Sequence, residues 1–206
     1  MRRPPRFCAL AAFALLFLLA SERAQAHGSR STPPPPGIQI ASLTHGQMAV
    51  IASYRGEIVD LAQRQTETGP IFRRLYNHGN LQFTYCLWGL MPRSLADEES
   101  PFNECSHAYL ATAKALLAFM ATMPSAQREA EELISEIDAD MVRSGASWIL
   151  CQFSGETFST GEVIVPKWSD VLFHFPSLAA LAAVVAALIA AAWSIVAVPL
   201  SRASGR

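Results

Sequence analysis

The stretch SPFNECSHAYLATAKALLAFMATMP, residues 100–124, has the pattern of one complete amphipathic helix. Its apolar residues recur every three or four positions, which places them along a single face of an α-helix. Ser100 and Pro101 are typical of the cap and first turn of a helix, and Pro124 is expected to end it. The apolar face consists of Phe102, Cys105, Tyr109, Ala113, Leu116, Met120 and Met123. Such a face needs neighbouring elements to cover it.

Three further segments show the same periodicity, and they supply those neighbours. They are residues 44–64, 70–91 and 125–144. Thr44 and Gln47 form a capping-box pattern at the start of the first segment, and Gly145 stands where a helix-ending glycine belongs. The connections are short, which favours antiparallel neighbours. The sequence therefore predicts a mostly α fold, an antiparallel helical bundle of about four helices, over residues 41–146.

Two segments beside the predicted bundle have a different composition. Residues 27–40 contain four consecutive prolines, which favour an extended Pro-rich arm. Residues 147–170 are rich in β-branched and aromatic side chains, interrupted by Ser-Gly and Thr-Gly pairs. This pattern predicts a β-hairpin or an extended juxtamembrane segment.

The chain closes with an apolar run, SLAALAAVVAALIAAAWSIVAVPL, residues 177–200. Its length is sufficient to cross a bilayer, so residues 171–200 are predicted to form a transmembrane helix. The alternative is a buried core helix of a soluble protein. Alanines at every fourth position permit close approach of a partner helix in the membrane, although an Ala-rich composition explains them equally well. These alanines are Ala179, Ala183, Ala187 and Ala191.

The N-terminus has the layers of a secretory signal peptide, residues 1–26. Arginines precede an apolar core at residues 8–20, and Ala24-Gln25-Ala26 provides small residues for cleavage between Ala26 and His27. An uncleaved anchor helix is the alternative. Basic residues after the second apolar run favour a cytoplasmic tail at 201–206. We therefore expect a single-pass protein of a bacterial inner membrane, with its N-terminal domain periplasmic and its C-terminus cytoplasmic.

The charge and the cysteines of the sequence bear on nucleic-acid binding and on disulfide pairing. Acidic residues outnumber basic ones between residues 27 and 170, which excludes the electrostatic footprint of a nucleic-acid binder. Cys86 near the end of one predicted helix and Cys105 near the start of the next lie at similar heights in an antiparallel pair. This placement predicts a Cys86–Cys105 disulfide in an oxidising compartment, with a bridge to Cys151 or no bridge as alternatives. An unpaired cysteine would be buried and inert or would pair with another chain.

A few residues are candidate metal ligands. Cleavage would leave His27 at the N-terminus, where its amine and imidazole together bind copper. His45 and Met48 are three apart at a helix start and share one face, while His107 lies off the apolar face. We expect His107 to face water near Lys114. Copper or zinc is the metal class that these side chains favour.

No nucleophile, zinc-protease or nucleotide-binding motif occurs in the chain, and no catalytic residue is assigned. The favoured interpretation is a membrane-anchored periplasmic accessory protein that contacts a larger membrane assembly. The alternative is a periplasmic metal-binding protein that binds copper or zinc, and an enzyme of unidentified class is the second alternative.

Overall fold

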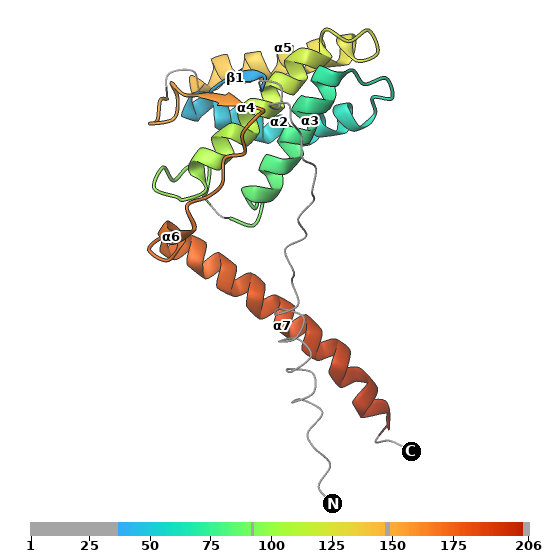
Figure 1. The fold of residues 1–206 in the computed structure, drawn as a ribbon, viewed down its shortest axis with the longest axis vertical. Helices are drawn as coiled ribbons and strands as arrows, with labels where there is room; N and C mark the ends of the chain where they lie inside the picture. Colours follow the sequence, from blue (N-terminus) through green and yellow to red (C-terminus); the bar gives the residue numbers. More distant parts are fainter. Residues whose placement is uncertain (1–36, 92, 147–148, 204–206) are drawn as a thin grey trace, which may run out of the picture. The chain divides into compact units, whose positions relative to one another are not determined.

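The computed structural model describes residues 37–91, 93–146 and 149–203 (Figure 1). The predicted signal peptide, its cleavage site at Ala26 and His27, and the first part of the Pro-rich arm lie outside the described residues. The described elements are β1 (Gln39–Ala41), α2 (His45–Gln63), α3 (Pro70–Tyr85), α4 (Asn103–Met120), α5 (Gln127–Ser144), β2 (Thr157–Ser159), α6 (Trp168–Val171) and α7 (Phe175–Ala203). The prediction of a mostly helical fold is confirmed.

Local sequence signals explain two of the helix ends. The Thr44 side chain accepts a hydrogen bond from the Gln47 backbone N–H (3.1 Å), and the Gln47 side chain accepts one from the Thr44 N–H (3.0 Å). This is the predicted capping box, and it fixes the start of α2. Gly145 ends α5 with φ of 62°, a left-handed conformation that glycine adopts without strain.

Other helix ends differ from the prediction. Helix α3 ends at Tyr85, because Leu87 and Gly89 adopt positive φ values that stop the helix before Pro92. Helix α4 begins at Asn103, since Ser100 forms a turn ahead of it in which its carbonyl oxygen accepts from the Asn103 N–H (2.9 Å). The Asn103 side-chain amide then donates to the Ser94 carbonyl (2.9 Å) and holds the preceding loop in place.

Helix α4 lies at the centre of the main core. It contacts α2, α3, α5 and β1. Most of its side chains are buried, including the polar Ser106, His107 and Thr112, which are all 0% exposed. The helix is Ala-rich, which lets neighbouring elements approach on several sides.

The two short strands are far apart in the sequence of the domain, and they pair with each other. Gln39 is opposite Ser159 and Ala41 is opposite Thr157, in antiparallel register. Ile40 and Phe158 stand between them and are both buried in the core. Strand β2 therefore has its partner at the end of the Pro-rich arm. Of the two alternatives predicted for residues 147–170, the described part of the segment ahead of α6 is extended and forms no hairpin of its own. Burial of Ile40 and Phe158 in the core favours this distant partner over a local one.

Helix α7 contains the apolar segment that the sequence predicts. Phe175–Ser194 is long and apolar enough to cross a membrane, with a mean hydropathy of 2.3, and 6% of it is buried. A smaller core of Met91, Phe102 and Val171 connects the start of α4 with α6. His174 adds a contact ahead of α7, where its Nε2 lies 3.1 Å from a carboxylate oxygen of Asp97.

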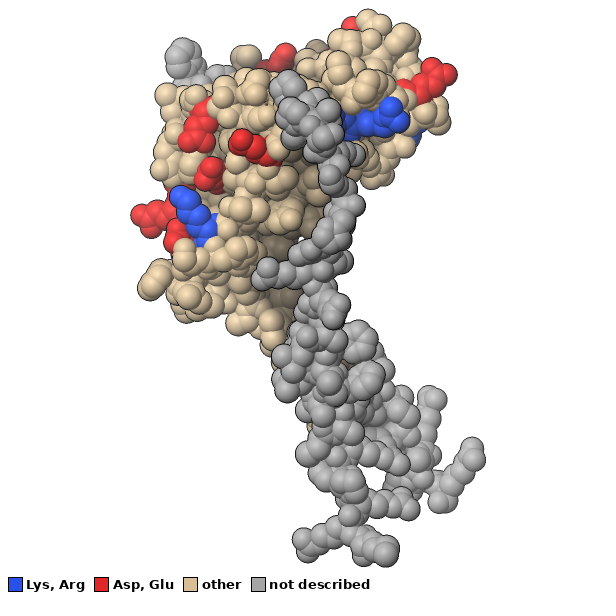
Figure 2. All heavy atoms as spheres, viewed as in Figure 1, with Lys and Arg blue, Asp and Glu red and all other residues tan. Residues whose placement is uncertain are grey.

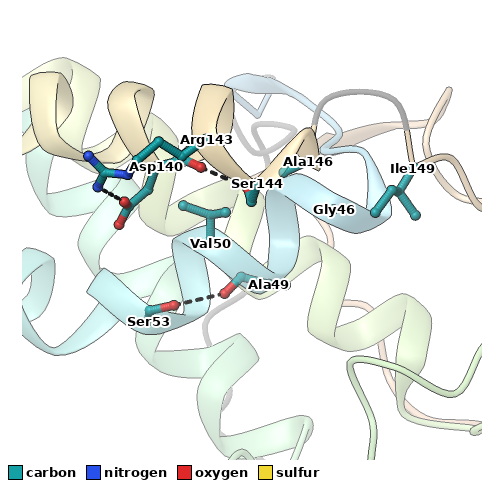
Figure 3. A pocket seen from close by; sticks show the side chains of 9 residues that line it. All are labelled: Gly46, Ala49, Val50, Ser53, Asp140, Arg143, Ser144, Ala146 and Ile149. Carbon is teal, nitrogen blue, oxygen red and sulfur yellow. Dashed lines mark hydrogen bonds and ion pairs between the residues drawn. The ribbon is translucent and has the colours of Figure 1, made fainter.

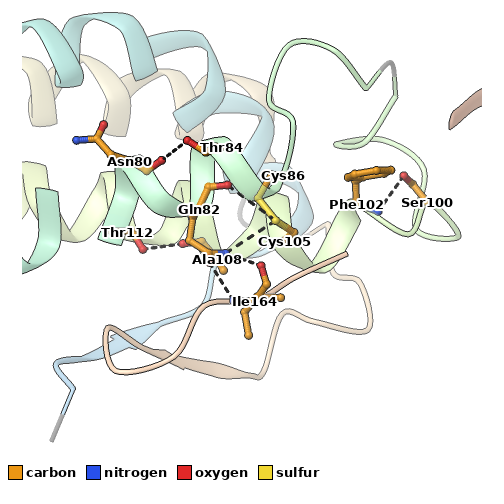
Figure 4. The surroundings of a disulfide bond; sticks show 10 residues. All are labelled: Asn80, Gln82, Thr84, Cys86, Ser100, Phe102, Cys105, Ala108, Thr112 and Ile164. Atoms are coloured by element: carbon orange, nitrogen blue, oxygen red, sulfur yellow. Dashed lines mark hydrogen bonds between the residues drawn. A yellow bond between two sulfur atoms is a disulfide. The ribbon is translucent and has the colours of Figure 1, made fainter. Parts of the chain in front are cut away.

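A disulfide joins the end of α3 to the first turn of α4 (Figure 4). Cys86 and Cys105 are its two residues, with their Cα atoms 5.4 Å apart. Beside it, the buried Gln82 side chain accepts from the Ile164 N–H (2.9 Å) and donates to the Ile164 carbonyl (3.3 Å). Gln82 thus holds an extended segment against α3 as a neighbouring strand would.

Removal of the disulfide is expected to destabilise the domain. The bridge spans a sequence separation of 19 residues, and closure of such a loop in the unfolded chain is worth about 3 kcal/mol. We expect a Cys86→Ala/Cys105→Ala variant to lose about that much free energy of unfolding, measured by urea unfolding of the full chain in detergent. Reduction of the wild-type protein should give the same loss. A loss below about 1 kcal/mol in both would contradict this account.

Candidate metal centre

Three potential metal ligands meet beside α4. His45 begins α2, His107 lies in the first half of α4, and Cys151 lies in the segment between α5 and β2. Each offers one donor atom, and these atoms all lie within 4.8 Å of one another. Cys151 Sγ and His107 Nε2 lie 3.0 Å apart. The fold therefore brings one thiol and two imidazoles close together.

A close backbone approach at Gly46 brings the Cys151 segment to α2. A Cβ atom at Gly46 would lie 2.0 Å from the Ala146 carbonyl oxygen, so only glycine allows this contact. The Gly46 N–H donates to the Ile149 carbonyl (3.1 Å), and the Thr44 hydroxyl donates to the Ala146 carbonyl (3.2 Å). Figure 3 shows Ala146 and Ile149 beside the start of α2. These contacts fix the chain just before Cys151.

The chain after Cys151 is fixed as well. The Ser154 hydroxyl accepts from the Cys151 N–H (2.9 Å) and lies 3.4 Å from Cys151 Sγ. The Ser42 hydroxyl donates to the Phe153 carbonyl (2.7 Å), and the Ser42 N–H donates to the Glu156 carbonyl (3.2 Å). Residues 151–156 are thus held against the β1 region, and Cys151 has a defined position.

His107 is the most enclosed member of the group. Its side chain is 0% exposed, and its ring lies 6.4 Å from that of His45 and 5.6 Å from that of Phe153 between centroids. The expectation that His107 faces water near Lys114 is therefore wrong. The reason is that α4 is covered on several sides, so a position off its apolar face is still buried.

Two ring nitrogens of the group are buried without a hydrogen-bond partner among the described residues. They are Nδ1 of His45 and Nδ1 of His107. Buried polar atoms in folded proteins nearly always have a partner, so each exception needs an explanation. Asn103 Oδ1 and Ser106 Oγ on α4 are also buried without a partner among the described residues. The nitrogen of His107 that faces Cys151 is Nε2. The feature specific to the cluster is therefore the convergence of its three donor atoms.

His78 provides the contrast. It is also a buried histidine, but its Nε2 donates to the Glu162 carbonyl (2.9 Å) and its Nδ1 lies 2.9 Å from the Thr112 hydroxyl oxygen. Both nitrogens lie within hydrogen-bond distance of a polar atom, so His78 is a structural link between α3, α4 and the segment after β2.

The protonation state of His107 suits metal binding better than acid–base chemistry. Burial, and to a smaller degree the charge of the neighbouring His45, lower the pKa of His107 to about 4. Imidazole binds metals in its neutral form. A catalytic cysteine, by contrast, needs a histidine that accepts the thiol proton and a third group that orients the ring. His107 is a weak base, and its Nδ1 has no orienting partner among the described residues.

The donor set fits a transition metal. Metal–nitrogen and metal–sulfur bonds of about 2.0–2.3 Å keep the donors of one ion within roughly 4 Å of one another. The observed limit of 4.8 Å is slightly wider, so small side-chain rotations would complete the contacts. Cysteine and histidine are the ligands that zinc and copper sites use.

The remaining sequence candidates lie elsewhere. Met48 is fully buried in the main core, one turn after His45 on α2. His27 lies outside the described residues. Cys151 was not identified as a ligand from sequence, because its partners are far away in the chain and no short spacing motif joins them. A pocket of about 450 Å³ between α2 and α5 contains Gly46 and Ile149 in its lining but none of the three ligands (Figure 3).

Comparison with protein-family models, curated proteins and solved structures gives no match to this chain.

The buried state of His78 makes the domain sensitive to acid. Burial lowers the pKa of His78, while its hydrogen bond to the Glu162 carbonyl acts in the opposite direction. Below about pH 6.5 the unfolded chain then binds a proton that the folded chain does not. The free energy of unfolding therefore decreases as the pH is lowered. We expect His78→Gln to show a smaller fall than wild type in chelator-treated protein, measured by urea unfolding between about pH 7.5 and pH 5. Equal slopes for the two proteins would contradict this.

Proposed function

We propose that this chain is a membrane-anchored metal-binding protein that holds one transition metal ion between His45, His107 and Cys151. The observation that carries the proposal is the convergence of these three donor atoms within 4.8 Å. This is the metal-binding alternative from the sequence, with Cys151 added to two of its candidates. Zinc and copper are the metals that this ligand set favours.

Binding at this position would link three separate parts of the domain. His45 comes from α2, His107 from α4 and Cys151 from the segment that precedes β2. A metal held by all three binds the folded chain only, because the unfolded chain keeps these residues apart. Metal binding would therefore raise the stability of the domain in proportion to its affinity.

The surface charge supports capture of a cation. Acidic residues outnumber basic ones over residues 27–170, and carboxylates lie across the face seen in Figure 2. A negative surface raises the local concentration of cations and speeds their association. The ligand group itself contains no carboxylate, so the surface charge would act on approach and not in the bound complex.

We place the domain in the periplasm, held at a bacterial inner membrane by α7 with the C-terminus in the cytoplasm. Support comes from the apolar Phe175–Ser194 segment and from exposed apolar side chains just ahead of it. Trp168, Leu172 and Phe173 are 53%, 68% and 89% exposed, as is typical of residues at a lipid–water interface. The Cys86–Cys105 disulfide fits an oxidising compartment.

The accessory role in a larger membrane assembly remains a prediction, as does the antiparallel bundle arrangement of the domain. Such a role would use the alanine face of α7 as the contact with a partner helix. The residues of that face are exposed in the structure. They are Ala179, Ala183, Ala187 and Ala191.

Metal binding is tested by thermal unfolding of the full chain in detergent with zinc or with copper under reducing conditions. At a free metal concentration of about one hundred times Kd, we expect a gain of about 2.7 kcal/mol, which raises Tm by about 5 °C or more. Cys151→Ser and His107→Gln should abolish the gain, since each removes a ligand. His78→Gln and His27→Ala are the matched controls and should keep it. Loss of the gain in His27→Ala alone would place the metal on the arm.

Membrane attachment is tested by ending the chain before Phe175. We expect the full chain to stay in the membrane pellet after alkaline extraction, and the shortened chain to leave it, because the apolar segment is gone. A tag placed after Arg206 should resist protease in intact spheroplasts. A shortened chain that remains in the pellet, or a tag that is digested, would contradict the proposed attachment or its orientation.

A further inference from the structure

We propose that the ion held by His45, His107 and Cys151 is monovalent copper, Cu(I), in preference to a divalent ion. This inference rests on the proposed metal-binding function and specifies the chemistry of that same site. Three observations lead to it: the charge of the ligand set, the number of its donors and the burial of the group.

The charge of the ligand set matches a monovalent ion. Bound cysteine contributes one negative charge as a thiolate, while the two imidazoles bind as neutral rings. The group contains no carboxylate. Cu(I) would therefore give a complex with no net charge, whereas Zn(II) or Cu(II) would leave one uncompensated positive charge beside the fully buried His107. An unpaired charge in a buried site is costly.

The number and kind of donors also favour Cu(I). Soft thiolate ligands select Cu(I), and Cu(I) is stable with three ligands. Structural zinc sites, in contrast, almost always use four protein ligands. The group offers three donors, and the uncharged hydroxyl of Ser154 lies 3.4 Å from Cys151 Sγ. The phenyl ring of Phe153 covers His107 on another side.

The members of the group differ in burial, so the ion would enter from the side of the less buried ones. His107 is enclosed, whereas His45 and Cys151 are half-buried and border the solvent. Binding replaces the Cys151 S–H bond by an S–Cu bond and releases the thiol proton to water. No electron is transferred, so copper enters and remains as Cu(I), and a reducing agent in the assay keeps the free ion in that state.

Ser154 offers a direct test of the charge argument. Its hydroxyl oxygen accepts a hydrogen bond from the Cys151 N–H and lies next to the thiol. Ser154→Asp keeps an acceptor for that N–H and adds one negative charge beside the metal, whereas Ser154→Asn is a neutral side chain of the same size. The added charge should favour a divalent ion.

The experiment measures affinity for Cu(I) and Zn(II) by competition with chromophoric chelators, on the full chain in detergent without oxygen. A Cys8→Ser background leaves Cys151 as the single cysteine outside the disulfide. We expect equimolar Cu(I) to displace bound Zn(II), and Cys151→Ser to weaken Cu(I) binding at least about 100-fold. Ser154→Asp should raise Zn(II) affinity at least about tenfold over Ser154→Asn. X-ray absorption should show copper with one sulfur and two nitrogen ligands.

The outcomes separate this inference from the proposed function. Zn(II) that resists equimolar Cu(I), or air-stable Cu(II) with an intense thiolate charge-transfer band, would overturn the preference for Cu(I) and leave metal binding intact. Equal zinc affinities for Ser154→Asp and Ser154→Asn would overturn the charge argument. If neither metal binds, or if Cys151→Ser binds as tightly as wild type, the proposed function fails as well.

Discussion

The enclosure of α4 is the constraint on which the rest of the domain depends. The helix contacts α2, α3, α5 and β1, so four of its polar side chains are buried: Asn103, Ser106, His107 and Thr112. Each then requires a partner inside the protein. The Asn103 amide finds one in the Ser94 carbonyl, and the Thr112 hydroxyl donates to the Ala108 carbonyl (2.7 Å). His107 has Cys151 as its partner, through Nε2. The candidate metal centre is defined by the approach of His45 to this pair.

The segment after α5 connects this centre with the membrane-directed end of the chain. It is held to the rest of the domain at several places, among them Ile149 at Gly46, Phe158 opposite Ile40, and Ile164 at Gln82. Cys151 lies between the first and second of these places, and α6 follows the third. A metal on Cys151 would add a further link to the same segment. Metal occupancy would then be coupled to the attachment of this segment through ordinary linkage.

Helix periodicity could be predicted from the sequence because it is a local property, and so could the capping box at Thr44 and the helix-ending Gly145. The candidate metal centre could not be predicted from the sequence. The apolar positions of residues 102–123 indicate one buried face, and a helix with one buried face leaves His107 at its surface. Its burial comes from β1 and the Cys151 segment, whose positions depend on contacts between residues far apart in the chain. Strands of three residues carry too little pattern to predict the β1–β2 pairing.

The state of Cys151 follows from the same arrangement. The disulfide of Cys86 and Cys105 leaves Cys151 as the free cysteine of the described residues, half-buried against His107 and Ser154. In an oxidising compartment a free thiol tends to pair or to oxidise, and both reactions begin from its thiolate. A thiolate bound to a metal no longer attacks a disulfide, so occupancy of the centre would protect the residue that forms it. In such a compartment, a role as metal ligand explains the unpaired Cys151 better than the view that it is simply left over after disulfide pairing.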